Sequence, residues 1–392
     1  MIASAAATSL TIVSPSLVLG TQANARIKVG CVGLGGRGAW IARHVKTHAG
    51  YEITAVADYF PEVAQAVGEE LGVPAERRFS GLKGYQRLID SQVEAVFLET
   101  PPYAFPEHVS AAVKAGCHVY IAKPLACDVP GSLVVDKMAR QATQQKKVFL
   151  CDFQTRTDEF YKEAVRRVHA GDIGDLAMLE VICGTNGFAD PPKTDTIADR
   201  LQGLVWVNDE ELGGGLLVNF DIHAVDVALW IANARPVSAM GCARRGDPKT
   251  NGNAPRVYSV TYQFANDLII AHHAEHIPDL REDGIVCNGR GNAGIIETAY
   301  SKKVWVHSDK TQSYEGGESP DIYANGMKAN VDTFHKSITE GIYDNPTLEP
   351  SINSTLATIL GREAARRNGL LTWDDMIKEN RRLEVDLTGL KE

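Results

Sequence analysis

A glycine-rich turn near the N-terminus constrains the fold of this chain more than any other feature. The stretch "IKVGCVGLGGRGAWIARHV" (27–45) joins a short apolar strand pattern to a helix pattern through a turn of the form G-x-G-x-x-G. The turn consists of Gly33, Leu34, Gly35, Gly36, Arg37 and Gly38. The three glycines of the motif, Gly33, Gly35 and Gly38, allow a tight turn, close approach of a pyrophosphate and close helix–strand packing, and the helix N-terminus attracts phosphate. The sequence therefore predicts a dinucleotide-binding site.

An acidic residue at the end of the next strand pattern indicates which dinucleotide is bound. The stretch "YEITAVAD" (51–58) ends in Asp58. A carboxylate at this place can accept hydrogen bonds from both hydroxyls of the adenosine ribose, which favours NAD over NADP. Arg37 or Arg77 could still reach a 2′-phosphate, so NADP is the second choice.

The order of the strand and helix patterns predicts two domains. Strands and helices alternate as far as Phe153, which is typical of a doubly wound parallel sheet. Strand patterns then follow one another directly from residue 236 to residue 308, as in a mostly antiparallel sheet. We predict an α/β protein, with a Rossmann domain at residues 26–150 and an α+β domain with a large open sheet at residues 151–392.

The first 25 residues carry no charge and end in the small-residue pattern Ala23-Asn24-Ala25. This composition resembles the apolar and cleavage regions of an export signal, although the usual basic region is missing. We predict a periplasmic or exported protein, or a cytoplasmic protein with a loosely packed N-terminal arm if the segment does not function.

Composition argues against several classes of partner. The net charge is −9 and no block of five basic residues occurs, so nucleic acid is not expected. The body of the chain has no run of 18 uncharged apolar residues, so no membrane span is expected there. No C-x-x-C motif occurs and the cysteines are widely spaced, which argues against a disulfide framework or a zinc cluster. The seven cysteines are at positions 31, 117, 127, 151, 183, 242 and 287.

Two neighbouring strand patterns end in polar residues followed by proline. Thr100 and Pro101 follow one strand, and Lys123 and Pro124 follow the next, with His108 on the helix between them. Because the carboxyl ends of parallel strands face the cofactor crevice, we expect these residues to contact the cofactor. Pro124 would fix the turn that directs Lys123.

These motifs resemble those of the Gfo/Idh/MocA family of dehydrogenases over residues 26 to about 390. The resemblance implies that Lys123, in the lysine–proline motif, contacts the substrate and the nicotinamide ribose. It implies that His223 in "GGGLLVNFDIHAVDVALW" (213–230) is the catalytic histidine. Asn219 stands where the family usually has Asp or Glu, and Asp226 matches a following acid. The catalytic candidates are therefore Lys123, His223 and Asn219.

The resemblance also implies a substrate-binding role for the second domain. Gln154 and Arg156 in "CDFQTR" (151–156) would lie near the substrate mouth, and Trp206 is a further candidate for substrate contact. Together with Lys123, Asn219 and His223 they form the predicted substrate site. The large sheet would also form the contacts of a homodimer or homotetramer.

Hydride transfer from a secondary C–H requires removal of the hydroxyl proton, which suits a histidine, while a nearby lysine stabilises the alkoxide. We predict one helix over 213–233 that places residues 219, 223 and 226 on one face. Ala122 and Asn219 replace carboxylates of the family pattern, which predicts a lowered pKa for His223. Asp221 would face elsewhere, unless the segment is not helical there.

The run "HHAEH" (272–276) has the residue types of a metal site. In a strand, His272 and His276 would share one face and His273 would point away. We therefore expect a sheet face or a subunit contact there, and no metal.

Three functional classes remain open. The first is an NAD-dependent dehydrogenase acting on a ring or polyol hydroxyl of a sugar, cyclitol or glycoside. The second is a redox-neutral glycoside-processing enzyme with tightly bound NAD, which is favoured if the protein is exported. The third is a catalytically inactive, cofactor-binding sensor, against which Lys123 and His223 argue.

Overall fold

The computed structural model describes residues 26–192, 197–244, 252–277 and 284–392. The segment predicted to resemble an export signal, residues 1–25, lies outside the described residues. Within the described residues no single helix is long and apolar enough to span a membrane. One bent pair, Glu210–Asn219 with Ile222–Ala232, has the required length and composition when the two helices are taken together.

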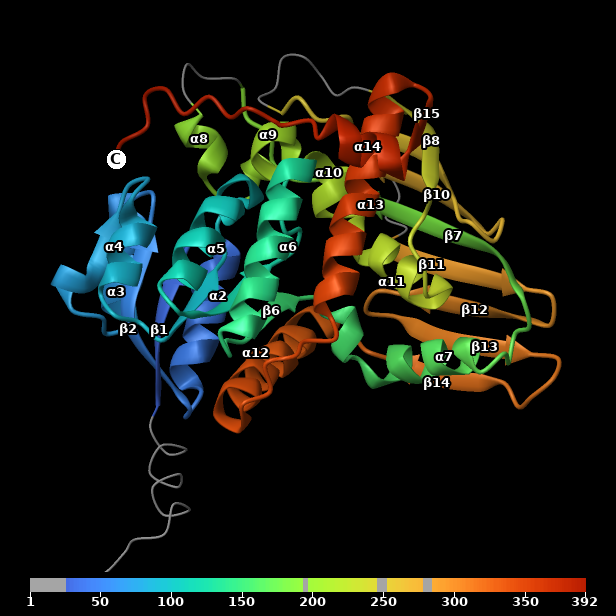
Figure 1. Ribbon diagram of the computed structural model, residues 1–392, viewed down its shortest axis with the longest axis horizontal. Coiled ribbons are helices and arrows are strands. Elements are labelled where there is room, and N and C mark those ends of the chain that lie inside the picture. The colour runs from blue at the N-terminus through green and yellow to red at the C-terminus, as the bar shows by residue number, and fades with distance from the viewer. Residues whose placement is uncertain (1–25, 193–196, 245–251, 278–283) are drawn as a thin grey trace, which may run out of the picture.

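The N-terminal domain is built on a six-stranded sheet in the order β3-β2-β1-β4-β5-β6, with every pair parallel (Figure 1). This is the strand order of a doubly wound nucleotide-binding fold, as predicted. The strands are β1 (Ile27–Val32), β2 (Tyr51–Asp58), β3 (Arg78–Ser80), β4 (Ala95–Leu98), β5 (His118–Ala122) and β6 (Phe149–Asp152). The helices are α2 (Gly36–Thr47), α3 (Pro61–Glu70), α4 (Gly84–Asp90), α5 (Phe105–Lys114) and α6 (Val129–Gln144).

The central strands of this sheet are buried on both faces. Every residue of β4, β5 and β6 is buried, which explains why these strands appear in the sequence as continuous apolar runs. All six strands run in the same direction, so their carboxyl ends form one edge. The residues at or just after these ends, such as Asp58, Lys123 and Asp152, therefore lie along a common edge.

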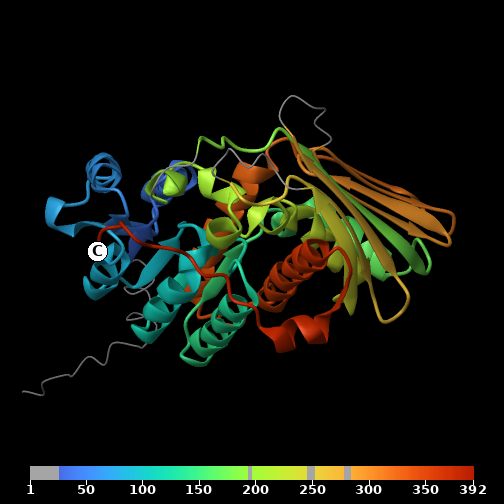
Figure 2. The same ribbon diagram turned by 90° about the horizontal axis from the view of Figure 1, so that it is seen from above.

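The second sheet has nine strands in the order β14-β13-β12-β11-β7-β10-β9-β8-β15. The pair β7–β10 is parallel and the other described pairs are antiparallel. Helices cover one face, and the opposite face is bare (Figure 2). The strands are β7 (Leu176–Thr185), β8 (Ser238–Arg244), β9 (Val257–Gln263), β10 (Ile269–His276), β11 (Gly284–Gly291), β12 (Gly294–Ala299), β13 (Lys303–Ser308), β14 (Tyr314–Glu318) and β15 (Leu370–Thr372).

Two long C-terminal helices connect the domains. Met327, Val331 and Phe334 of α12 pack in the core of the N-terminal domain, although they lie in the second domain by sequence. Helix α13 contacts both α6 and the large sheet. The helices of this half are α7 (Glu159–His169), α8 (Ala198–Leu201), α9 (Glu210–Gly213), α10 (Gly215–Asn219), α11 (Ile222–Ala232), α12 (Ile322–Glu340), α13 (Leu348–Arg367) and α14 (Trp373–Glu379).

The predicted single helix over 213–233 is wrong. The chain forms two helices, α10 and α11, and the axis bends by 53° at the break between them. The break falls at Phe220 and Asp221, where the Asp221 carboxylate lies against two histidines of β10. Residues 219, 223 and 226 therefore do not share one continuous helical face.

Candidate active site

The glycine turn has the shape that a pyrophosphate requires. Gly33 has φ +84°, and a Cβ on it would lie 2.7 Å from backbone atoms of Glu99 and Thr100. A Cβ on Gly38 would lie 1.8 Å from the carbonyl oxygen of Gly33, so only glycine lets α2 pack this closely. In contrast, a Cβ on Gly35 or Gly36 would meet open space. This open space lies at the N-terminus of α2, and the N-cap residue makes no side-chain hydrogen bond there. A phosphate therefore has room to accept hydrogen bonds from the free backbone N–H groups of the helix.

Asp58 stands beside this turn, at the end of β2. Its Oδ2 accepts a hydrogen bond from the N–H of Leu34 at 2.7 Å, and its Oδ1 accepts from Phe60 at 2.9 Å. Burial raises the pKa of Asp58, against the opposing effect of these two hydrogen bonds. Each carboxylate oxygen keeps a further lone pair, so the group can still accept hydroxyls of a ribose. The turn and Asp58 together fit the adenosine and pyrophosphate parts of NAD.

Thr100 and His108 form one hydrogen-bonded pair after β4. The Thr100 Oγ1 lies 3.2 Å from the His108 Nδ1, and the imidazole stacks on Tyr85 with 4.1 Å between ring centroids. Burial lowers the pKa of His108 to about 4, so its ring is neutral at physiological pH. His108 thus holds Thr100 in place. Pro101, the half-buried residue after Thr100, precedes a short 3-10 turn at Pro102–Ala104.

Two acidic residues that were not predicted lie at the carboxyl edge of the N-terminal sheet. Glu99 follows β4, Asp152 ends β6, and their side chains are 3% and 0% exposed. Arg37 of the glycine turn pairs with both: its Nε lies 3.2 Å from the Glu99 Oε2, and its guanidinium also contacts the Asp152 carboxylate. Burial raises the pKa of Glu99 to about 7, although Arg37 opposes this shift. Arg37 is therefore directed toward these carboxylates.

Asp152 also accepts hydrogen bonds from two residues that come after β6 in the chain. Its Oδ1 accepts from the Asn330 Nδ2 at 2.7 Å, and its Oδ2 accepts from the Gln154 Nε2 at 2.9 Å. Gln154, predicted to contact substrate, is fully buried in this network. One signal in the sequence could have revealed both acids: each closes an apolar strand in the same way as Asp58 does, in "VFLE" (96–99) and "VFLCD" (148–152).

Lys123 and Asn219, 96 residues apart in sequence, meet between the domains. The Lys123 Nζ donates to the backbone carbonyl of Asn219 at 2.7 Å. Burial lowers the pKa of Lys123 to about 7, and the Arg37 cation adds to this effect, while Asp152 and Glu99 oppose it. The Asn219 side chain lies 3.5 Å from the carbonyl of Gly213. Pro124, which follows Lys123, is buried.

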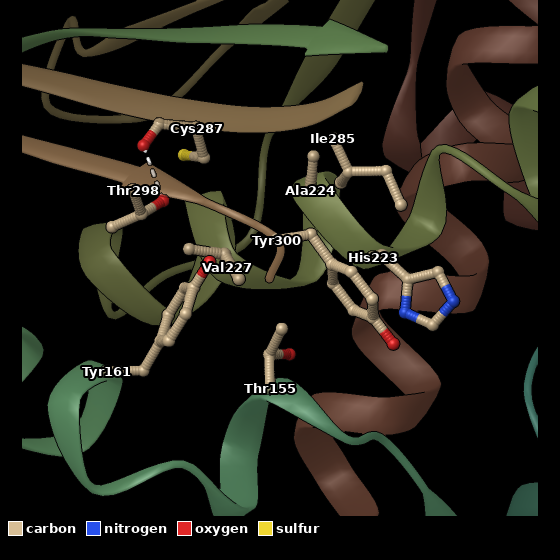
Figure 3. Close-up of a pocket in the computed structure, with 9 residues that line it drawn as sticks. All are labelled: Thr155, Tyr161, His223, Ala224, Val227, Ile285, Cys287, Thr298 and Tyr300. Atoms are coloured by element: carbon tan, nitrogen blue, oxygen red, sulfur yellow. Dashed lines mark hydrogen bonds between the residues drawn. The ribbon is translucent and has the colours of Figure 1, made fainter. Parts of the chain in front are cut away.

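His223 is buried at the start of α11. Its ring lies beside the phenol of Tyr300, with 5.2 Å between centroids (Figure 3). Burial lowers the pKa of His223 well below its usual value, and the cations Lys123 and Arg37 add to the shift. The direction agrees with the prediction, but burial contributes more than any other cause. The pocket in Figure 3 has no free volume for a water molecule.

Arg156 and Asp226 form a buried pair. The Arg156 Nε lies 2.8 Å from the Asp226 Oδ2, its Nη2 lies 2.9 Å from Oδ1, and Ser354 also donates to that carboxylate at 2.6 Å. The guanidinium is thus held by Asp226, and a contact of Arg156 with substrate stays a prediction. Trp206 lies in the 3-10 turn Val205–Asn208, where its indole donates to the carbonyl of Gly203 at 3.0 Å. Its contact with substrate also stays a prediction.

The histidines of β10 have the predicted orientation. His272 and His276 are buried on the face toward the helices, while His273 is exposed on the other face. Asp221 lies against His272 and His276. It therefore does not replace the carboxylate that Asn219 lacks.

Comparisons with known proteins agree with this architecture. The model of an oxidoreductase family with an NAD-binding Rossmann fold matches residues 27–153. The model of the GFO/IDH/MocA C-terminal domain matches residues 161–282. The crystal structure of aldose–aldose oxidoreductase from Caulobacter crescentus, complexed with glycerol, superimposes with a TM-score of 0.70 at 18% identity. It covers 88% of this chain and 99% of that one, and shows the same fold.

Curated relatives share only about a quarter of their aligned residues with this chain. An uncharacterized oxidoreductase of Synechocystis sp. is 23% identical over 339 residues, which cover 79% of this chain and 86% of the relative. The scyllo-inositol 2-dehydrogenase (NAD(+)) of Bacillus subtilis is 27% identical over 222 residues, which cover 56% of this chain and 58% of the relative. This chain thus aligns with little more than half of the dehydrogenase whose substrate is named. The two family models, which together match well over half of the sequence, show that the chain belongs to the Gfo/Idh/MocA family of NAD-binding oxidoreductases.

Proposed function

We propose that this protein is an NAD-dependent oxidoreductase that acts on a ring or polyol hydroxyl of a sugar, cyclitol or glycoside. One observation carries the proposal: Lys123, Asn219 and the start of the helix that bears His223 come together at the carboxyl edge of the nucleotide-binding sheet. Both the named Bacillus relative and the Caulobacter neighbour are, by name, oxidoreductases of polyhydroxylated substrates, which supports this substrate class.

The chain's residues would divide the work as follows. NAD, when bound, accepts the hydride from the carbon that carries the reacting hydroxyl. The glycine turn and Asp58 would hold its pyrophosphate and ribose. Lys123 in its neutral form donates to the Asn219 carbonyl and keeps its lone pair free, so it can accept the hydroxyl proton while the C=O bond forms. The sequence favoured His223 as the proton acceptor. Because burial, Lys123 and Arg37 lower the pKa of His223 well below its usual value, we propose Lys123 for that role instead. The neutral imidazole of His223 would accept a hydrogen bond that orients the substrate.

We expect kcat/KM for oxidation to rise as the pH increases through about 7 and then to level off. The pKa of Lys123 is about 7, and only the neutral amine accepts a proton. The charged and titratable groups that face Lys123 are Arg37, Glu99, Cys151, Asp152 and His223. The measurement is a pH profile at saturating NAD.

Glu99 requires a control, because its pKa is also about 7. In Glu99→Gln the rise should persist and move to lower pH, because the Glu99 carboxylate favours the charged form of Lys123. A flat profile in this variant would assign the titration to Glu99 instead of Lys123.

A second candidate, a redox-neutral enzyme that retains NAD, is supported by the C-terminal segment. This segment follows α14 and crosses to the N-terminal domain (Figure 1). The Lys391 N–H donates to the Tyr59 hydroxyl at 3.2 Å, and its carbonyl accepts from Leu82 at 3.0 Å. Tyr59 and Leu82 follow the ends of β2 and β3, so the segment lies along the edge where the adenosine of NAD would bind.

The experiment that tests both candidates starts with purified full-length protein. NAD released by denaturation is quantified first, and NADH formation is then recorded with inositols, aldoses and nitrophenyl glycosides. Steady NADH production with one of them supports the dehydrogenase. Glycoside conversion without net NADH, by protein that already contains NAD, supports the redox-neutral enzyme. Protein that neither contains nor binds NAD would refute both. An exported location and a homo-oligomeric state stay predictions, which fractionation and light scattering would test.

A further inference from the structure

A second cluster of chemically active side chains lies at the break between α10 and α11. The Asp221 carboxylate stands there, and two imidazoles from β10 approach its two oxygens. The His272 Nε2 lies 3.3 Å from Oδ2, and the His276 Nε2 lies 2.9 Å from Oδ1. All three side chains are 0% exposed.

The His272 and His276 nitrogens lie close to the Asp221 oxygens, but these contacts do not have the geometry of well-formed hydrogen bonds. Within the described part of the chain, neither Asp221 oxygen and neither Nε2 has a partner with hydrogen-bond geometry. The Nδ1 atoms of both histidines also have none there. Buried polar atoms without well-formed hydrogen bonds destabilise a protein. Because several such atoms, the Asp221 oxygens and the histidine nitrogens, surround one place, a metal cation that binds their lone pairs would stabilise the cluster.

Cys183 on the neighbouring strand β7 adds a soft donor. One donor atom each from Cys183, Asp221 and His272 lie within 4.8 Å of one another, and all three residues are buried. Two donors on a tetrahedral ion with bonds of about 2.0–2.1 Å stand about 3.3 Å apart, which matches the separation of His272 and Asp221. Thiolate, imidazole and carboxylate together suit Zn²⁺, whereas Mg²⁺ and Ca²⁺ prefer oxygen ligands.

We propose that Cys183, Asp221 and His272 bind one zinc ion, while His276 contacts the other oxygen of the Asp221 carboxylate. We expected no metal at HHAEH from the sequence, and the ligands of this site come from three separate segments and lack the usual short spacings. All three ligands are buried, so we assign the ion a structural role. It would connect β7 and β10 to the helix break.

The position of Asp221 gives the ion a consequence for the active site. Asp221 lies two residues after Asn219 and two residues before His223. An ion that fixes Asp221 would therefore also fix the carbonyl that accepts from Lys123 and the start of the helix that bears His223. The alternative is a metal-free cluster in which the two imidazoles pair directly with the buried carboxylate. This alternative needs no zinc, so metal content separates the two.

The test measures metal in full-length protein that has been purified without a histidine tag. Mass spectrometry of the wild type should find about one zinc per chain. His272→Ala and Cys183→Ala should lose most of it. His273→Ala, which changes the exposed histidine on the same strand, should keep it, as should Cys287→Ala, which changes a buried cysteine on the adjacent strand β11. Removal of zinc by a strong chelator should lower the Tm of the wild type by at least about 5 °C.

Three results would overturn the proposal. The first is folded wild type that contains no transition metal and takes up neither Zn²⁺ nor Co²⁺. The second is full zinc content in His272→Ala, and the third is loss of zinc in His273→Ala. If the ligand variants do not fold, X-ray absorption of the wild-type zinc decides the question. A shell with one sulfur neighbour supports the site, and a shell of nitrogen and oxygen alone refutes it. None of these readouts depends on the proposed catalytic activity.

Discussion

Lys123→Met should reduce kcat for oxidation by about a thousandfold or more. Methionine has a similar length and apolar stem, but it can neither accept the hydroxyl proton nor donate to the Asn219 carbonyl. The glycine turn and Asp58 do not depend on this side chain, so the affinity for NAD should change by less than about tenfold. The measurement pairs steady-state kinetics with NAD titration of the same preparation.

A matched control is available in the same domain. Lys83 is an exposed lysine whose Nζ lies 3.0 Å from the Glu107 Oε1. Lys83→Met removes one surface ion pair, which contributes little to stability, and should leave kcat unchanged. Turnover of Lys123→Met within about tenfold of the wild type would contradict the assignment of Lys123 as the proton acceptor.

The fold could be predicted because its signals are local. Strand and helix patterns alternate in the first domain, and the glycine turn marks where the first strand meets its helix. The short strand β3 was not predicted, and the sequence left open which domain α12 packs against. Both depend on contacts between segments far apart in sequence, which no window of residues contains.

The candidate site was predictable in part for the same reason. Lys123 and Asp58 stand at strand ends, so the parallel sheet alone brings them to one edge. The break at Asp221 could not be read from the apolar pattern of 213–233, because its cause is contact with His272 and His276, about 50 residues later. Glu99 and Asp152 both form ion pairs with Arg37. The sequence indicated only that Arg37 belongs to the phosphate turn, so these pairs could not be predicted.

The structure shows which carboxylates lie near Lys123 although Ala122 and Asn219 have none. Each lacks a carboxylate that the family pattern has, which would leave Lys123 among cations alone. Asp152 and Glu99 supply two carboxylates on the strands on either side of Lys123, and both favour its charged form. The negative charges near Lys123 therefore come from the two neighbouring strands and not from positions 122 and 219. Burial and Arg37 still outweigh these acids, so the pKa of Lys123 remains low.

Gly35→Ala should weaken NAD binding strongly while leaving the fold intact. The added methyl group would meet no protein atom within 4 Å, and the backbone at Gly35, with φ −64° and ψ −171°, accepts any residue. The Tm should therefore stay within about 2 °C of the wild type. The same methyl group would occupy the space through which a pyrophosphate approaches α2, so the Kd for NAD should rise about a hundredfold.

Gly38→Ala is the comparison variant, because it should lower both the affinity for NAD and the stability of the fold. Its added methyl group would lie 1.8 Å from the Gly33 carbonyl oxygen, a backbone atom that cannot move aside freely. This variant should lose NAD affinity and also melt several degrees lower, because helix–strand packing is disturbed. Calorimetric titration and thermal melts of both variants give the comparison. If Gly35→Ala binds NAD as tightly as the wild type, the open space beside the turn is not where the pyrophosphate lies, and the glycines serve only to pack α2 against β1.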